Sequence, residues 1–162
     1  MLLTKVISGG QTGADQGALQ AARAAGIATG GTAPKGYRTE RGSMRELLQG
    51  TYGLAESASE DYPPRTEQNV LAADATLILS HDHQSAGTLA TLRFCKKHRK
   101  DYYITTPELM NAWEIFQFVR DRFKTPGVLN VAGNRESSFP GIQQKTDVLL
   151  QCVFHHLQGK QL

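Results

Sequence analysis

The first 25 residues hold a short strand-like run that passes through a glycine-rich turn into an alanine-rich helix pattern. Leu3 to Ser8 (LTKVIS) is rich in β-branched residues and leads into Gly9 and Gly10, with Gly13 close behind. From Ala14 to Ala25, alanine and leucine recur at helical spacing. A strand that turns directly into a helix with a small-residue face indicates a βα unit, because such a helix can lie close against a sheet.

The same alternation continues along the chain. Helix patterns cover 65–73, 87–98 and 142–157, and Pro107 fits the first turn of one more, which contains Trp113. Further strand patterns cover four segments: 27–30, 75–80, 101–105 and 128–132. This order predicts one α/β domain over residues 1–162, a Rossmann-like three-layer sandwich with a mostly parallel sheet and helices on both faces.

One stretch does not follow the alternation. Residues 31–64 are polar and glycine-rich, with few apolar side chains. A compact domain rarely keeps an irregular segment of this length without a purpose. The sequence leaves open whether it is an ordered lid or a mobile arm.

The composition restricts the kinds of protein to which this chain can belong. Hydrophobic residues make up 40% and charged residues 20% of the 162, which is typical of a globular chain. No apolar run is long enough to span a membrane, and the N-terminus does not resemble a signal peptide. Cys95 and Cys152 are isolated, which favours reduced thiols and a cytoplasmic location. A net charge of +3 fits a small anionic ligand better than a nucleic acid.

Three polar loops follow predicted strands. They are the glycine turn at 9–13, the segment 81–87 and the segment 134–141. Because the carboxyl ends of parallel strands share one edge of a sheet, we expect these loops to converge there, where open α/β sheets bind ligands.

The glycine turn (SGGQTGADQ) has two interpretations. Free N–H groups and the helix dipole at a helix start favour a bound phosphate. The alternative is a tight structural turn in which Thr12 and Asp15 form a capping box. Capping explains those two residues but not three glycines. We therefore predict phosphate binding at the turn, by Gly9, Gly10, Gln11, Thr12 and Gly13.

Other polar residues stand at predicted loop ends and helix starts. Gly87 and Thr88 begin a helix, although Thr88 could be only its N-cap, as could Thr66 for the helix at 65–73. Lys35, with Arg38 and Arg41, forms a cationic segment that could close over an anion or lie on a solvated surface. Four charged residues complete the set of candidates: Arg65, Glu67, Arg135 and Glu136.

No metal site is predicted. His81, Asp82 and His83 could each ligate a metal, but three consecutive loop residues rarely point at one ion. His155 and His156 are neighbours on a helix, about 100° apart, so they do not chelate together. No nucleophile–histidine or paired-carboxylate arrangement stands out.

The order of motifs resembles a known family. The chain contains, in this order, ISGGQTGADQGAL, a Gly-Gly-x-x-Pro-Lys-Gly segment, RTEQNVLAADATLIL, AGTLAT and LNVAGNRES with PGI. This series is similar to the putative molybdenum carrier family, also described as circularly permuted YpsA-like proteins of the SLOG superfamily. The resemblance implies a Rossmann-like fold, a homodimer or homotetramer, and a nucleotide-like or phosphate-bearing ligand. For an algal relative it implies binding of molybdenum cofactor, a pterin that carries a phosphate.

Three functions are consistent with these motifs and the resemblance, the last of them a partner-binding or sensor module whose assembly changes with its ligand. The first is a carrier-like protein that binds a pterin cofactor or a nucleotide, with Lys35 or Arg135 neutralising its charge. The second is a nucleotide N-glycosidase similar to the LOG phosphoribohydrolases of the same superfamily. Those enzymes carry a glutamate where this chain has Thr91, so a hydrolase would need its carboxylate at Asp15, Glu67 or Glu136.

Overall fold

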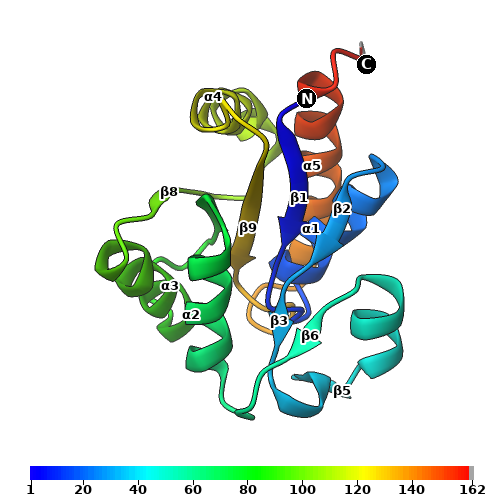
Figure 1. The fold of residues 1–162 in the computed structure, drawn as a ribbon, viewed down its shortest axis with the longest axis vertical. Coiled ribbons are helices and arrows are strands. Elements are labelled where there is room, and N and C mark those ends of the chain that lie inside the picture. Colours follow the sequence, from blue (N-terminus) through cyan, green and yellow to red (C-terminus); the bar gives the residue numbers. More distant parts are fainter. Residues whose placement is uncertain (161–162) are drawn as a thin grey trace.

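Five parallel strands form the central sheet of the structure, a computed structural model that describes residues 1–160 (Figure 1). Their order across the sheet is β2-β1-β9-β7-β8, and each neighbouring pair is parallel. The strands are β1 (Leu3–Ile7), β2 (Ala28–Gly30), β7 (Ala75–Leu79), β8 (Asp101–Thr105) and β9 (Gly127–Gly133). The predicted sheet is confirmed.

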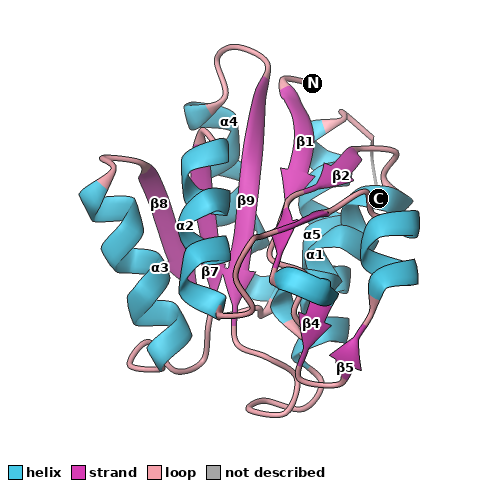
Figure 2. Cartoon of the chain, turned by 60° about the horizontal axis from the view of Figure 1, so that its bottom comes forward, coloured by secondary structure: helices cyan, strands magenta, loops and turns pink. Residues whose placement is uncertain are grey.

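Helices cover both faces of this sheet (Figure 2). The larger core joins one face to α1 (Ala14–Ala24), α4 (Ala112–Arg122) and α5 (Ile142–Leu157). A smaller cluster of Val70, Phe94 and Cys95 lies between α2 (Tyr62–Ala72) and α3 (Ala86–Lys97) on the other face. The predicted three-layer sandwich is therefore confirmed, with α1 packed closely against α5 and the sheet through its small residues.

Most predicted boundaries lie within about two residues of those observed, as is usual for helix ends. Two predicted helix starts were wrong. The helix α2 begins at Tyr62, because Pro63 and Pro64 fit its first turn, where a backbone N–H is not needed. Pro107 is not in the first turn of α4, which begins five residues later. Asn111 donates its side-chain amide to the carbonyl of Thr106 at 3.0 Å, which stabilises the turn before that helix.

Residues 31–61, here called the insert, are ordered. They contain four short strands, β3 (Thr32–Ala33), β4 (Arg38–Thr39), β5 (Gly42–Ser43) and β6 (Ala55–Glu56), and a helical turn at Glu46–Thr51. Their scattered apolar side chains make a separate small core, in which Tyr37, Leu48 and Leu54 pack against Leu19 of α1. The segment is the least regular part of the described chain, as expected, but its small core was not predicted, because widely spaced apolar residues gather only in three dimensions.

Within residues 1–160, the structure has no helix of the length and apolar character needed to cross a membrane.

Candidate ligand-binding site

A cavity of about 590 Å³ lies at the carboxyl edge of the sheet, where β1, β7 and β9 end (lower part of the sheet in Figure 1). The loops that follow these three strands converge there, as predicted, and the start of α2 closes a further side. Of the predicted site residues, the cavity brings together five: Gln11, Asp15, Arg65, Gly87 and Arg135.

The need for glycine at position 9 is explained by the side chain of Arg65. A Cβ on Gly9 would lie 1.6 Å from Nη1 and 2.4 Å from Cζ of Arg65, so only glycine leaves room for the guanidinium. Arg65 also lies over the ring of Tyr62, with Cζ 5.4 Å from its centre. The group that approaches the backbone at Gly9 is thus a cation held by α2.

The other two glycines of the turn have structural reasons of their own. Gly10 and Gly13 have φ angles of +76° and +91°, which other residues rarely adopt. A Cβ on Gly13 would also lie 2.5 Å from the carbonyl oxygen of Asn134 and 2.7 Å from the backbone nitrogen of Glu136. The turn is therefore packed directly against the loop that follows β9.

Five consecutive N–H groups at the start of α1 are already hydrogen-bonded within the chain. Gly10 donates to Ser8 Oγ at 3.3 Å, Gln11 to Asp15 Oδ2 at 3.2 Å, and Thr12 to Gln11 Oε1 at 3.0 Å. Gly13 donates to Gln143 Oε1 and Ala14 to the carbonyl of Asn134, each at 3.1 Å. Side chains and backbone thus occupy the donors expected to face a phosphate.

The expected capping box is absent from this turn. The residue before α1 is Gly13, and the hydroxyl of Thr12 donates to Glu40 instead of to the helix. The carboxylate of Asp15 accepts from Gln11, one residue earlier than a capping box requires. The alternative interpretation of this turn, a capping box, was therefore wrong, since Thr12 donates to the insert and the N-cap is Gly13.

Asp15 and Arg65 form a buried pair on the wall of the cavity. Arg65 Nη1 lies 3.4 Å from Asp15 Oδ2, and the two side chains are 12% and 4% exposed. Burial raises the pKa of the Asp15 carboxyl, against the opposing effects of the Arg65 charge and the Gln11 N–H. Within residues 1–160, Arg65 Nε and Gln11 Nε2 are buried donors without an acceptor. Unpaired buried donors are costly, so both atoms would be stabilised by an oxygen acceptor that reached them from the cavity.

The start of α3 is open to the cavity. Ser85 is the N-cap, with its Oγ accepting from the Thr88 N–H at 3.4 Å. The N–H groups of Ala86 and Gly87 have no hydrogen-bond acceptor within the described chain, as expected for the first turn of a helix. A Cβ on Gly87 would meet no atom within 4 Å. This terminus therefore offers free donors and space.

Thr88 itself points inward. Its side chain is buried, and its Oγ1 lies 3.0 Å from Ser80 Oγ and 2.9 Å from Ser85 Oγ. Neither Thr88 nor Thr66 is an N-cap: Thr66 lies inside α2 and donates to the carbonyl of Tyr62 at 3.0 Å. Ser85 was missed as the N-cap, although serine is among the residues preferred at that position.

Asn134 ties two of the loops together. Its Oδ1 accepts from the N–H of His81 at 2.8 Å and from Ser80 Oγ at 3.0 Å, and its Nδ2 donates to Ser85 Oγ at 3.3 Å. This side chain is buried, so it fixes the loop after β9 against the start of α3.

Glu40 connects the insert to the site. Its carboxylate accepts from the hydroxyls of Thr12 and Ser137 and, at 3.1 Å, from the Ser137 N–H. Gln11 Oε1 accepts from the Glu40 N–H at 2.9 Å. Burial disfavours the charged carboxylate, but the hydrogen bonds from Ser137 and Thr12 outweigh it and hold the pKa of Glu40 below its usual range. No signal in the sequence singled out this residue.

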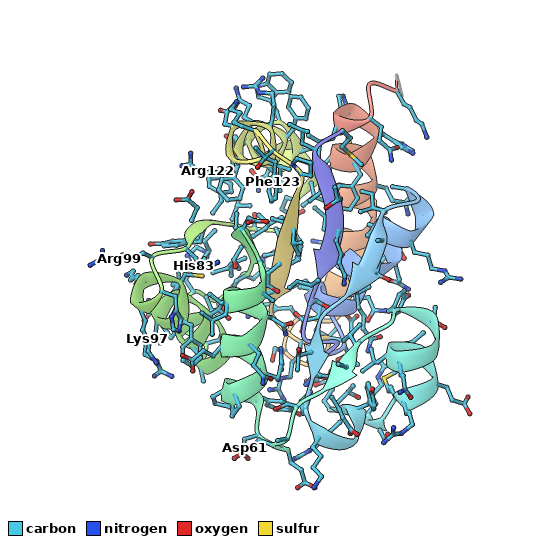
Figure 3. All side chains as sticks on the ribbon, viewed as in Figure 1. Asp61, His83, Lys97, Arg99, Arg122 and Phe123 are labelled. Atoms are coloured by element: carbon cyan, nitrogen blue, oxygen red, sulfur yellow. The ribbon has the colours of Figure 1, made fainter. Side chains whose placement is uncertain are left out.

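Several predicted residues lie outside the cavity wall. Lys35 is exposed in the insert. Glu67 forms ion pairs with Lys97 Nζ at 2.9 Å and with His98 Nε2 at 2.7 Å, and so faces α3, where Figure 3 labels Lys97. Glu136 accepts from the N–H groups of Gly141 and Gln143 at the start of α5. These two carboxylates therefore have structural partners away from the cavity.

The His81–His83 segment does not gather its side chains around one point. His81 Nε2 lies 3.7 Å from Glu108 Oε1, whereas Asp82 Oδ1 accepts from the N–H of Gln84 at 2.9 Å. Within residues 1–160, no three histidine, cysteine or carboxylate side chains are grouped to hold a metal ion.

Comparison with known proteins agrees with this architecture. The model of the circularly permuted YpsA SLOG family matches residues 6–154. A crystal structure of a putative molybdenum carrier protein from Syntrophus aciditrophicus SB is similar over 94% of this chain and 95% of its own, with 36% sequence identity and a TM-score of 0.82. No curated protein matches the chain.

Proposed function

Since this chain belongs to the circularly permuted YpsA SLOG family, we propose that it is a carrier-like protein that binds a phosphate-bearing small molecule in the cavity described above. The ligand class is a pterin cofactor or a nucleotide. The phosphate lies between the start of α3 and Arg65, with Arg135 providing a further positive charge.

The observation that carries this proposal is a cluster of donors that lack acceptors. Arg65 Nε, Gln11 Nε2 and the N–H groups of Ala86 and Gly87 belong to residues that line one cavity. A helix N-terminus and a guanidinium both favour a bound anion. One phosphate has enough oxygens to accept from several of these donors together.

The rest of the wall suits a flat ring system. Pro63, Ala90 and Ala132 give the cavity apolar surface beside its polar residues. The volume of about 590 Å³ is in the range typical of sites for small cofactors. A pterin or a nucleobase fits this combination of ring contact and anion binding.

Molybdenum, in this proposal, is cargo and arrives already bound to its ligand. Neither Cys95 nor Cys152 lines the cavity, so the chain offers no thiolate there as a soft metal ligand. The donors that line it fit the oxygens of a phosphate.

Binding is favoured over hydrolysis by the positions of the carboxylates. Of the three candidates for acid–base catalysis, only Asp15 lines the cavity, and its Oδ2 is held by Gln11 and Arg65. Asp15 in this position orients Arg65 toward the ligand.

The test is native mass spectrometry of freshly purified protein, followed by denaturation and identification of any released compound. We expect a pterin or a nucleotide that carries phosphate. Calorimetry with inorganic phosphate then compares Arg65→Gln, for which we expect at least about a tenfold loss of affinity, with Lys35→Gln, which removes the same charge outside the cavity. Equal effects of the two variants would contradict the proposal.

A further inference from the structure

Three arginines from three parts of the chain converge on the ring of Tyr62. Arg65 and Arg135 have Cζ atoms 5.4 Å from the ring centre, and Arg38 of the insert has its Cζ at 5.8 Å. Tyr62, Arg65 and Arg135 line the cavity, whereas Arg38 is exposed and is not part of its wall. We call these four residues the rim cluster.

The positive charge of the rim cluster is only partly neutralised. Arg65 pairs with Asp15, but within residues 1–160 neither Arg38 nor Arg135 makes a salt bridge. The charge of Arg135 contributes to lowering the pKa of Glu40, whose carboxylate oxygens accept hydrogen bonds from Thr12 and Ser137. Within residues 1–160, Arg38 therefore has no salt-bridge partner, and Arg135 has only the more distant charge of Glu40.

Packing on a tyrosine does not explain this arrangement. One guanidinium group is enough to cover one face of the ring, and each further one adds charge repulsion between the arginines. Arg65 and Arg135 are at most about 11 Å apart, because the Cζ atom of each lies 5.4 Å from the same ring centre. The planar guanidinium group donates to two oxygens at once, so several arginines around one rim suit an anion with several oxygens.

We propose that the rim cluster binds a second anionic group next to the phosphate at the start of α3, so that the ligand is a diphosphate compound such as a nucleoside diphosphate. This inference rests on the proposed function. Gln11, 7% exposed and with Nε2 unpaired, lies with Arg65 on the inner wall and serves the first phosphate. Arg38 serves only the second, whereas Arg135 lies between the two and contacts both.

The experiment is calorimetric titration of the full chain with inorganic phosphate and with inorganic pyrophosphate at one fixed ionic strength. We expect pyrophosphate to bind about tenfold more tightly than phosphate or better, because it reaches both groups of donors. Arg38→Gln is expected to weaken pyrophosphate binding about tenfold and phosphate binding less than about twofold.

Arg41→Gln is the matched control. Arg41 is exposed in the same insert and outside the rim cluster, so its loss changes the net charge equally. Equal affinity for the two anions, or equal weakening of pyrophosphate by Arg38→Gln and Arg41→Gln, overturns the diphosphate assignment and leaves the proposed function standing. Failure of both anions to bind overturns the proposed function, and the assignment with it.

Discussion

The helices α1 and α3 begin at the same edge of the sheet, yet their N-termini differ in what they offer a ligand. At α1, the five N–H groups from Gly10 to Ala14 all have acceptors within the chain. At α3, the N–H groups of Ala86 and Gly87 have none within residues 1–160, and the space beside Gly87 is open. Both termini carry the positive end of a helix dipole, but the first two N–H groups of α3 are free, whereas in the first two positions of α1 only the N–H of Asp15 lacks an acceptor within residues 1–160.

This difference shows how glycines serve two separate purposes. Around α1 they let other parts of the protein come close, Arg65 at Gly9 and the loop after β9 at Gly13. At α3 a single glycine leaves the wall of the cavity free of a side chain. A glycine-rich turn can therefore be the support of a binding site, with the ligand bound beside it.

The largest expected effect is on stability. Gly13→Ala forces a methyl group against the backbone of Asn134 and Glu136 at a φ of +91°, so we expect a loss of about 3 kcal/mol. Gly87→Ala meets no atom within 4 Å and should change the free energy of unfolding by less than about 1 kcal/mol. Urea denaturation of both variants measures the contrast. Similar losses in the two would remove the distinction between the helix starts.

A second variant tests whether the glycine turn holds Arg65 in position for the ligand. Gly9→Ala requires the Arg65 guanidinium to move, since it lies 1.6 Å from the new Cβ. We expect phosphate affinity to fall about tenfold, because Arg65 leaves its place beside Asp15. Calorimetry on the folded variant measures this loss. Unchanged affinity would mean that Arg65 is not held for the ligand.

A third, smaller effect depends on pH. The lowered pKa of Glu40 means that its stabilising effect is present above the ordinary glutamate pKa and is lost as pH falls through the lower folded value. We expect Glu40→Gln to cost about 1 kcal/mol at pH 7, with the difference from the unmodified chain shrinking in acid. Denaturation curves at several pH values test this. A difference independent of pH would show that the charge of Glu40 contributes nothing.

The smallest expected effect is that of Glu67→Gln. Its carboxylate faces Lys97 and His98 and not the cavity, so phosphate affinity should change less than about twofold. A loss of tenfold or more in the same titration would place Glu67 in the site after all.

The sequence was sufficient to predict the three layers and the edge of the sheet at which the loops meet, because strand and helix periods are local signals. It predicted that the loops after β1, β7 and β9 meet, and Gln11, Arg65, Gly87 and Arg135 do line one cavity. The roles of the glycines could not be predicted, because the group beside Gly9 comes from a helix more than fifty residues away.

Tyr62 and Glu40 were missed for a similar reason. Tyr62 precedes two prolines, and these made the first turn of α2 look like part of a loop in the sequence. Glu40 lies in the insert, and its contacts with Thr12 and Ser137 join parts of the chain 28 and 97 residues away. Long-range hydrogen bonds of this kind leave no periodic pattern in a sequence.

In the proposed function, the anion binds at the start of α3 and not at the glycine turn. A titration of ¹⁵N-labelled protein with inorganic phosphate, followed by amide chemical shifts, tests this directly. We expect the N–H signals of Ala86 and Gly87 to move most, together with Nε–H of Arg65, while those of Gly10 to Ala14 stay nearly still. The largest shifts at Gly10 to Gly13, with Ala86 and Gly87 unmoved, would contradict it.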